Sequence, residues 1–258
     1  MKILICVKQV PESESPIHIG RAGRIQTDAI TEFKMNRLDE FAVEEAVLIK
    51  EALPETRIDV ITIGPERSAE VIKRAIGMGA DDGIHVITEF ESYLSSSNIA
   101  AWIAQYARAK KYTLILTGAM SEDNMQGQVG PMIAARLALP CATAVVQERI
   151  SPDKQFVYVE REMEGGHRDT LELPLPAVLT IQSGINTPRY PSLSNLLKAN
   201  RQKQVIIHAG NLANPAAGEE LVQVVYPQKL RSGAVLKGTR EEKAIRLLDI
   251  LRERALLS

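Results

Sequence analysis

The segment of this chain best suited to bind a ligand is a glycine-rich loop between an expected strand and an expected helix. It spans residues 118–131, contains Gly118, Gly127 and Gly130, and leads into a helix expected to open at Pro131. Unpaired backbone N–H groups and the helix dipole favour a phosphate at a helix N-terminus. A long connection without a ligand is the alternative, but loops of this length in compact domains are usually functional. The loop therefore favours a nucleotide site.

Sequence motifs of catalysis are absent from the chain. It has no GxxxxGK[ST] phosphate loop, no GxSxG turn and no HExxH metal motif, and its four histidines lack metal-ligand spacing. A near-match to a dinucleotide fingerprint at residues 77–83 follows an expected helix instead of a strand, so we interpret it as a helix C-cap and turn. Cys6 and Cys141 are expected to be reduced thiols. These patterns indicate binding without turnover, and they predict no catalytic residue and no metal site.

Composition restricts the class of protein. Of the 258 residues, 45% are hydrophobic, and 31 Lys+Arg against 32 Asp+Glu give a formal net charge of −1. This balance is typical of a globular protein and removes the global electrostatic argument for nucleic-acid binding. An aromatic content of 4% also argues against a base-stacking surface. The apolar run near the N-terminus is too short for a signal sequence or a membrane span, so we expect a cytoplasmic protein without direct membrane insertion.

Strands and helices are expected to alternate in the first half of the chain. Continuous apolar runs predict buried strands at residues 3–7, 58–63, 84–87 and 114–117. Helical spacing of apolar residues predicts helices at residues 39–53, 68–78, 97–110 and 131–139. Such alternation gives a doubly wound, mainly parallel sheet that binds ligands beyond the carboxyl ends of its strands. The glycine-rich loop, the loops at residues 7–11 and 64–65, and the helix start at residues 36–40 share that edge.

The pattern changes after Cys141. Strands are predicted at residues 144–150, 156–162, 170–173 and 177–181, with a glycine turn at 164–166, and they add an antiparallel edge. We therefore predict a nucleotide-binding α/β domain over residues 1–188. Residues 189–258 are predicted to form an arm that packs on a partner chain and ends in a helix with a Thr239–Glu242 capping box. A terminal helix that folds back on its own sheet is the open alternative.

One stretch has a local excess of positive charge. Residues 187–203 contain no acidic residue, and basic side chains surround Leu193, Leu196 and Leu197. Cations around protruding leucines suit docking onto an acidic partner protein, with Leu193 as the anchor. The alternative is a solvated basic helix end, which most short charge runs are, and the residues alone favour that alternative.

Several blocks together resemble one protein family. The blocks are ILICVKQVP, NRLDEFAVEEA, AIGMGAD, GQVGP, VEREMEGG, LPAVLT and NTPRYPSLSNLLK. In this order, over about residues 1–203, they are similar to the beta subunit of electron transfer flavoprotein. The resemblance implies a Rossmann-like fold of the adenine-nucleotide alpha-hydrolase-like type. It also implies a heterodimer with an alpha subunit that carries electrons from flavin dehydrogenases, such as the acyl-CoA dehydrogenases of fatty acid oxidation, to a quinone reductase or another acceptor.

The resemblance also implies cofactors and site residues. AMP would be bound structurally in this chain, whereas the redox FAD would be bound mostly by the alpha subunit. The residues implied for the AMP pocket are Cys6, Asn36, Arg37, Leu38, Asp39, Ile63, Ser121, Asp123, Asn124, Gly127, Gln128, Val129, Gly130 and Met132. Partner docking would use Tyr190, Leu193, Leu196, Leu197 and Lys198, and Glu162 would contact the mobile flavin domain.

Some positions depart from the family pattern and leave alternatives open. Ser13 stands where a tyrosine near the flavin is frequent, Ser194 replaces a usual proline, and Asp169 stands where Glu or Gln is usual. A second hypothesis places a second FAD in the AMP pocket, as in electron-bifurcating relatives that oxidise NADH, because AMP and FAD share an adenosine monophosphate half. A third is a stand-alone adenine-nucleotide-binding enzyme on a related fold.

Overall fold

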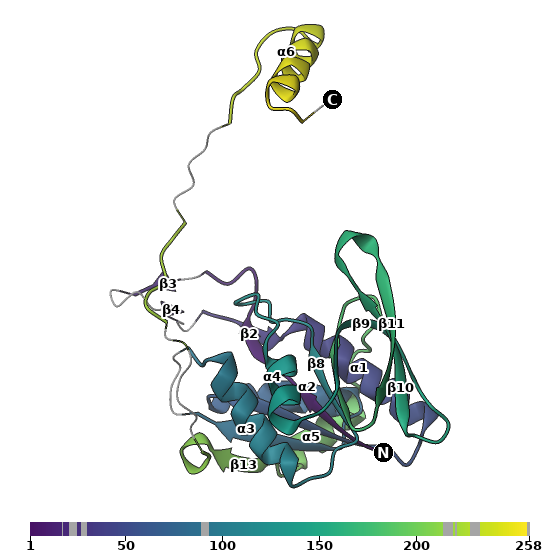
Figure 1. Ribbon diagram of the computed structural model, residues 1–258. Coiled ribbons are helices and arrows are strands. Elements are labelled where there is room, and N and C mark those ends of the chain that lie inside the picture. Colours follow the sequence, from purple (N-terminus) through teal and green to yellow (C-terminus); the bar gives the residue numbers. More distant parts are fainter. Residues whose placement is uncertain are drawn as a thin grey trace. The chain divides into compact units, whose positions relative to one another are not determined.

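The computed structural model describes residues 1–16, 18–20, 25–26, 30–88, 93–213, 219, 221–227 and 233–256. The chain divides into two compact units, Met1–Val224 and Val225–Ser258. The helices are α1 (Arg37–Ala52), α2 (Ala69–Met78), α3 (Ser96–Arg108), α4 (Val129–Leu137), α5 (Leu193–Arg201) and α6 (Arg240–Glu253). The first five belong to the first unit and α6 to the second (Figure 1).

A nine-stranded sheet forms the centre of the first unit, in the order β11-β10-β9-β12-β8-β1-β6-β7-β13. Its strands are β1 (Lys2–Cys6), β6 (Arg57–Gly64), β7 (Asp82–Ile87), β8 (Leu114–Gly118), β9 (Cys141–Ile150), β10 (Phe156–Glu162), β11 (Arg168–Pro174), β12 (Ala177–Ile181) and β13 (Val205–His208). All neighbours pair in parallel except β9–β10 and β10–β11. The predicted parallel α/β sheet with an antiparallel edge is therefore confirmed.

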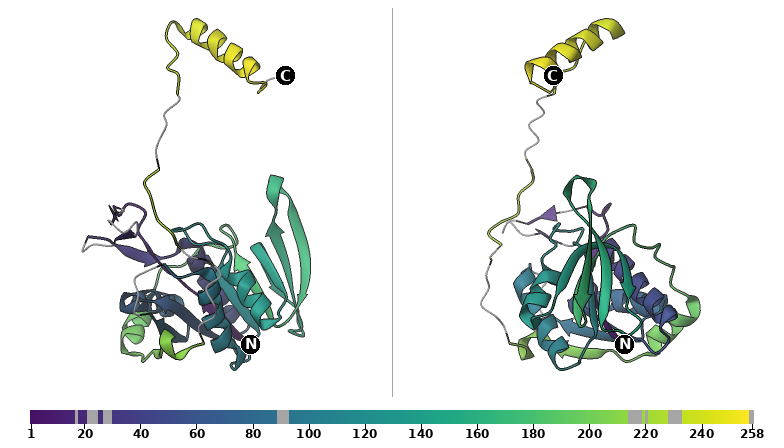
Figure 2. Two further views of the ribbon diagram at one scale, coloured as in Figure 1. Left: turned by 60° about the vertical axis from the view of Figure 1, so that its left-hand side comes forward. Right: turned by 45° about the vertical axis from the view of Figure 1, so that its right-hand side comes forward.

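Two hydrophobic cores cover the two faces of this sheet. Because successive strand side chains point to opposite faces, Ile3 and Ile5 pack with α1 and α2, whereas Leu4 and Cys6 pack with α3 and α4. The runs that predicted the central strands are apolar on both faces for this reason. The β10–β11 hairpin extends beyond the helices of the first unit (Figure 2), and its turn holds Gly165 and Gly166 at φ 75° and 77°.

The first unit reaches further along the chain than residue 188, the predicted end of the nucleotide-binding domain. Helix α5 packs against α2, and β13 adds to the sheet as a parallel neighbour of β7. The residues of β13 are three apolar side chains and a histidine, a run too short to stand out in the sequence. Four short strands were also not predicted: β2 (Gln9–Pro11) pairs with β5 (Phe33–Met35), and β3 (His18–Ile19) pairs with β4 (Ile25–Gln26).

The second unit contains α6, which begins with the predicted capping box. The Thr239 hydroxyl accepts a hydrogen bond from the Glu242 N–H, and the Glu242 carboxylate accepts one from the Thr239 N–H. Among the residues that the structure describes, no helix has the length and the apolar composition needed to cross a membrane.

Residues 77–83, which nearly match a dinucleotide fingerprint, form a helix C-cap and turn in the structure. Gly79 ends α2 with φ 139°, and a Cβ atom there would lie 3.1 Å from Cγ2 of Val47. We expect Gly79→Ala to lower the free energy of unfolding by about 1–2 kcal/mol, because an L-residue at positive φ is strained. The nucleotide binding predicted for the glycine-rich loop should be unchanged. Chemical denaturation and nucleotide extraction measure both, and a loss of nucleotide without a loss of stability would contradict the C-cap interpretation.

Candidate functional site

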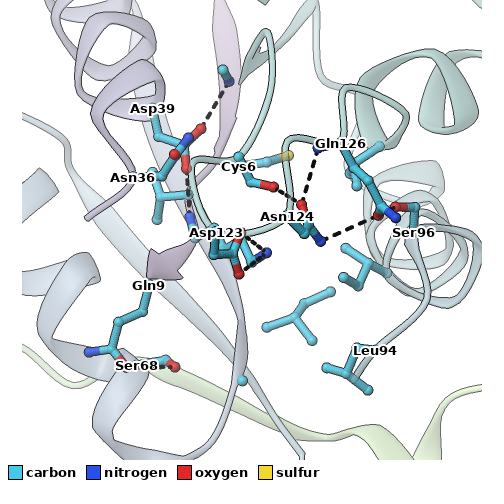
Figure 3. A pocket seen from close by; sticks show the side chains of 18 of the residues that line it. Cys6, Gln9, Asn36, Asp39, Ser68, Leu94, Ser96, Asp123, Asn124 and Gln126 are labelled. Atoms are coloured by element: carbon cyan, nitrogen blue, oxygen red, sulfur yellow. Dashed lines mark hydrogen bonds and ion pairs between the residues drawn. The ribbon is translucent and has the colours of Figure 1, made fainter. Parts of the chain in front are cut away.

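A cavity of about 860 Å³ opens beyond the carboxyl ends of β1, β6 and β8. The glycine-rich loop after β8 and the N-terminal ends of α1, α3 and α4 supply much of its lining. Figure 3 shows Asn36 and Asp39 on one side of the space and Ser96 and Gln126 on the other. In parallel α/β folds, ligands bind at this edge of the sheet. The glycine-rich loop therefore lies at the edge where the sequence predicted a ligand.

Asn36 connects the first turn of α1 to the glycine-rich loop. Its side-chain amide donates a hydrogen bond of 3.0 Å to the Met120 carbonyl, and its Oδ1 accepts one of 3.0 Å from the Glu122 N–H. Asn36 is 1% exposed, so both polar groups of the amide are satisfied in a buried position. The two bonds hold the loop against α1, although the segments lie more than 80 residues apart in sequence.

Asp39 lies in the same first turn of α1 and joins the ends of two strands. Its Oδ2 accepts a hydrogen bond of 2.7 Å from the Lys8 N–H after β1, and its Oδ1 accepts one of 3.0 Å from the Gly118 N–H at the end of β8. Burial raises the pKa of Asp39 to about 7, although both N–H donors and the Asn36 side chain lower it. The carboxyl group is therefore largely engaged by the backbone and is not free to act on a ligand.

The glycine-rich loop is folded by its own polar side chains. Gln126 Oε1 accepts a hydrogen bond of 2.8 Å from the Ser96 hydroxyl at the start of α3, and Asn124 Oδ1 accepts one of 3.2 Å from the Gln126 N–H. Asp123 pairs with the Lys8 ammonium group at 2.7 Å. These contacts connect the loop to α3 and to the end of β1, so three elements of the cavity wall are fixed to one another.

Two glycines of the loop are close to other parts of the protein. A Cβ atom on Gly127 would lie 2.6 Å from the Ala119 carbonyl oxygen, and one on Gly130 would lie 2.5 Å from Cγ2 of Thr180. Within the described part of the chain, the N–H groups of residues 127–130 donate no hydrogen bond. Helix α4 begins at Val129, two residues before the predicted Pro131, so these N–H groups form its N-terminus and can receive an anion.

Apolar side chains also line the cavity. They are Ile61, Ile63, Leu94, Ile99 and Ile103. The Cys6 thiol also lines the cavity, and burial together with the nearby Asp39 raises the pKa of Cys6. The thiol therefore stays protonated at neutral pH and is a weak nucleophile. Apolar side chains and an anion site in one cavity fit a flat heterocycle that carries a phosphate.

The structure brings most of the implied nucleotide residues together. Those that line the cavity are Cys6, Asn36, Asp39, Ile63, Ser121, Asp123, Asn124, Gly127, Val129 and Gly130. Four others do not line it: Arg37 and Gln128 are exposed, Leu38 is buried, and Met132 on α4 is half-buried and packs against the core. The lining residues that sequence reasoning missed include Ser68, Leu94 and Ser96. They follow β6 and β7, and the rule that ligands bind beyond parallel strand ends could have indicated them.

The residues implied for contacts with partner proteins do not line this cavity. Tyr190, Leu193 and Leu197 are 91%, 75% and 53% exposed, and Lys198 is also exposed. Leu196 differs, because its side chain packs toward α2. Glu162 is an exposed residue at the end of β10, paired with Arg168 of β11 across the protruding hairpin. Among the described residues, no group of three His, Cys, Asp or Glu side chains is arranged to hold a metal ion.

Comparisons with known proteins agree on one family. The sequence model described as "Electron transfer flavoprotein domain" matches residues 27–211. The chain is 35% identical to "Electron transfer flavoprotein subunit beta" of Bos taurus, over 97% of this chain and 98% of that protein. It is 33% identical to "Electron transfer flavoprotein subunit beta, mitochondrial" of Arabidopsis thaliana, over 99% of each chain. It is 27% identical to the subunit beta of Methylophilus methylotrophus, over 98% of each chain.

The raised pKa of Asp39 predicts a pH-dependent stability. Because this pKa is about 7 in the native state and about 3.9 in the unfolded chain, the native state binds more protons between these values. The stability from this group is therefore fully present below about pH 4 and is lost as the pH rises toward 7. We expect Asp39→Asn to be destabilised by about 1–3 kcal/mol at pH 4, because its amide N–H₂ faces a backbone donor. That deficit should shrink toward pH 7.

Unfolding of both proteins in denaturant at several pH values measures this difference. Asp123→Asn serves as the control, since Asp123 pairs with Lys8 at the same cavity but its side chain is 28% exposed. A deficit of Asp39→Asn that stays constant or grows between pH 4 and 7 would show that the native pKa is not raised.

Proposed function

The chain belongs to the electron transfer flavoprotein family as a beta subunit, and on this premise we propose that it binds AMP in the cavity beyond β1, β6 and β8. Paired with an alpha subunit that binds most of the FAD, it would carry electrons from flavin dehydrogenases, such as acyl-CoA dehydrogenases, to a quinone reductase or another acceptor. A cytoplasmic location and a part in fatty acid oxidation belong to the same proposal.

The observation that carries the AMP proposal is the arrangement of the cavity wall. The N–H groups at the start of α4 suit a phosphate, and the isoleucines of the lining suit an adenine ring. Gly127 approaches the Ala119 carbonyl so closely that a side chain would displace the loop. Polar groups of Ser121, Asn124 and Gln126 also line the cavity and can meet a ribose.

A role as a carrier subunit without its own turnover also fits the chemistry of this wall. Its buried carboxyl group, Asp39, accepts hydrogen bonds from two backbone N–H groups, and its thiol, Cys6, has a raised pKa. Neither group is arranged as a general base or nucleophile. The stand-alone enzyme hypothesis is disfavoured by the same observations and by the family of the chain.

A second FAD in this cavity is the other candidate, and one observation favours it. The lining continues past the loop to Gln9, Phe33 and Arg67, where the guanidinium of Arg67 stacks on the Phe33 ring at 4.3 Å from its centre. This extension leaves room for a ligand longer than AMP. A beta subunit with FAD here would belong to a bifurcating flavoprotein that oxidises NADH.

Counting nucleotides in the purified heterodimer separates the two candidates. We expect one FAD and one AMP per dimer, measured by absorbance and chromatography after denaturation. Two FAD and no AMP would contradict the AMP proposal and support the bifurcating type. We also expect Gly127→Ala to retain less than about half of the AMP, because a Cβ 2.6 Å from the Ala119 carbonyl forces the loop to move.

Gly210→Ala is the matched control for this substitution. A Cβ atom at Gly210 would meet no atom within 4 Å, so nucleotide content should equal that of the wild type. If Gly127→Ala kept full AMP content, the anion site would not depend on the loop.

Docking of an electron-donating dehydrogenase is proposed for α5 and Tyr190. Leu193 and Leu197 are one helical turn apart and both exposed, and large exposed apolar side chains beside cations suit a protein partner. We expect Leu193→Ala to lower kcat/KM for reduction by the cognate dehydrogenase about tenfold, the effect of losing an anchor residue. Flavin content should stay unchanged.

Leu48→Ala provides the comparison, because Leu48 is an exposed leucine on α1, 39% accessible. Stopped-flow reduction of the flavin measures both variants. Equal rates for Leu193→Ala and wild type would remove Leu193 from the docking surface.

A further inference from the structure

The segment from Arg189 to α5 is attached to the domain at two separate points. We propose that Arg189 and Gly77 are positioning residues that hold residues 190–201 in the conformation that docks the dehydrogenase. This inference rests on the docking role proposed above. It adds how a short exposed helix is kept ready for a partner.

The first attachment point is a cluster of hydrogen bonds between Arg189 and two carboxylates of α1. The Arg189 N–H donates to Glu44 Oε2 at 3.0 Å, its Nε donates to the same oxygen at 2.9 Å, and Nη2 donates to Glu44 Oε1 at 2.9 Å. Nη1 donates to Glu51 Oε1 at 2.6 Å. Glu44 is buried whereas Glu51 is exposed. A planar guanidinium that engages two carboxylates fixes direction as well as distance.

The second attachment point is the surface of α2 at Gly77. A Cβ atom on Gly77 would lie 2.7 Å from Cδ2 of Leu196 and 2.8 Å from Cβ of Pro191. The Gly77 carbonyl accepts a hydrogen bond of 3.1 Å from the Ser192 N–H. Only glycine permits this approach. Gly77 lies within α2, where a glycine does not stabilise the helix. The glycine is therefore explained by the segment packed on it.

These two points determine which leucines face outward. Leu196 packs on Gly77 and Ala199 is 2% exposed, whereas Leu193 and Leu197 point away from the domain. A helix of nine residues is marginal in water without tertiary contacts. Losing either attachment should release the helix, and a partner would then have to order it on binding, which weakens association.

The test uses the purified heterodimer with Arg189→Ala or Gly77→Ala. Arg74→Ala is the matched control, since Arg74 on α2 pairs with Glu40 on α1 at 2.7 Å, an arginine–carboxylate pair to the same helix from outside the segment. Hydrogen–deuterium exchange of residues 190–201 reports its order. Steady-state reduction by an acyl-CoA dehydrogenase supplied with octanoyl-CoA reports KM for the heterodimer.

We expect both variants to exchange faster in residues 190–201 and to raise KM roughly tenfold with kcat, FAD content and reduction by dithionite unchanged. Arg189→Lys should recover part of the effect and Arg74→Ala should match wild type. Unchanged exchange, or faster exchange with unchanged KM, would overturn the inference. If the dehydrogenase does not reduce even the wild-type heterodimer, the proposed docking function is contradicted. The positioning role is then contradicted too, regardless of the hydrogen–deuterium exchange result.

Discussion

The cavity depends on the buried hydrogen bonds that Asn36 and Asp39 make at the first turn of α1. Parallel strands end side by side, but their ends carry N–H groups that need acceptors away from water. The Asp39 carboxylate supplies two acceptors, one for the end of β1 and one for the end of β8. Asn36 adds the loop that follows β8. These four hydrogen bonds hold the strand ends and the loop against α1 and so define this side of the cavity wall.

The same bonds explain why the residue at the end of β8 is glycine. A Cβ atom on Gly118 would lie 2.4 Å from Oδ1 of Asp39 and 2.9 Å from the backbone of Leu38. The carboxylate can accept the Gly118 N–H only because the position carries no side chain. Burial raises the pKa of Asp39, so the arrangement costs stability at neutral pH. The hydrogen bonds at the strand ends therefore require the Asp39 carboxyl group to be buried, which is unfavourable for its charged form.

The sequence predicted the features that depend on local pattern. Some features depend only on residues close together in the sequence, and the structure has each of them. They are the apolar runs of β1, β6 and β8, the capping box of α6 and the glycine-rich loop before α4. Features that depend on tertiary contact were missed. Helix α5 forms on α2, and β13 needs the edge of β7. Ser68 and Ser96 reach the cavity only because their helices start at the same edge of the sheet.

Helix α1 connects the two surfaces on which the proposed function depends. Its first turn carries Asn36 and Asp39 at the cavity, and further along it Glu44 and Glu51 hold Arg189 beside the docking segment. A ligand that binds only the native state stabilises every contact that the native state requires. A nucleotide against the first turn of α1 would therefore also stabilise the helix that positions α5, without touching α5 itself. This stabilisation of α1 would give a nucleotide that undergoes no reaction a physical role in a carrier subunit.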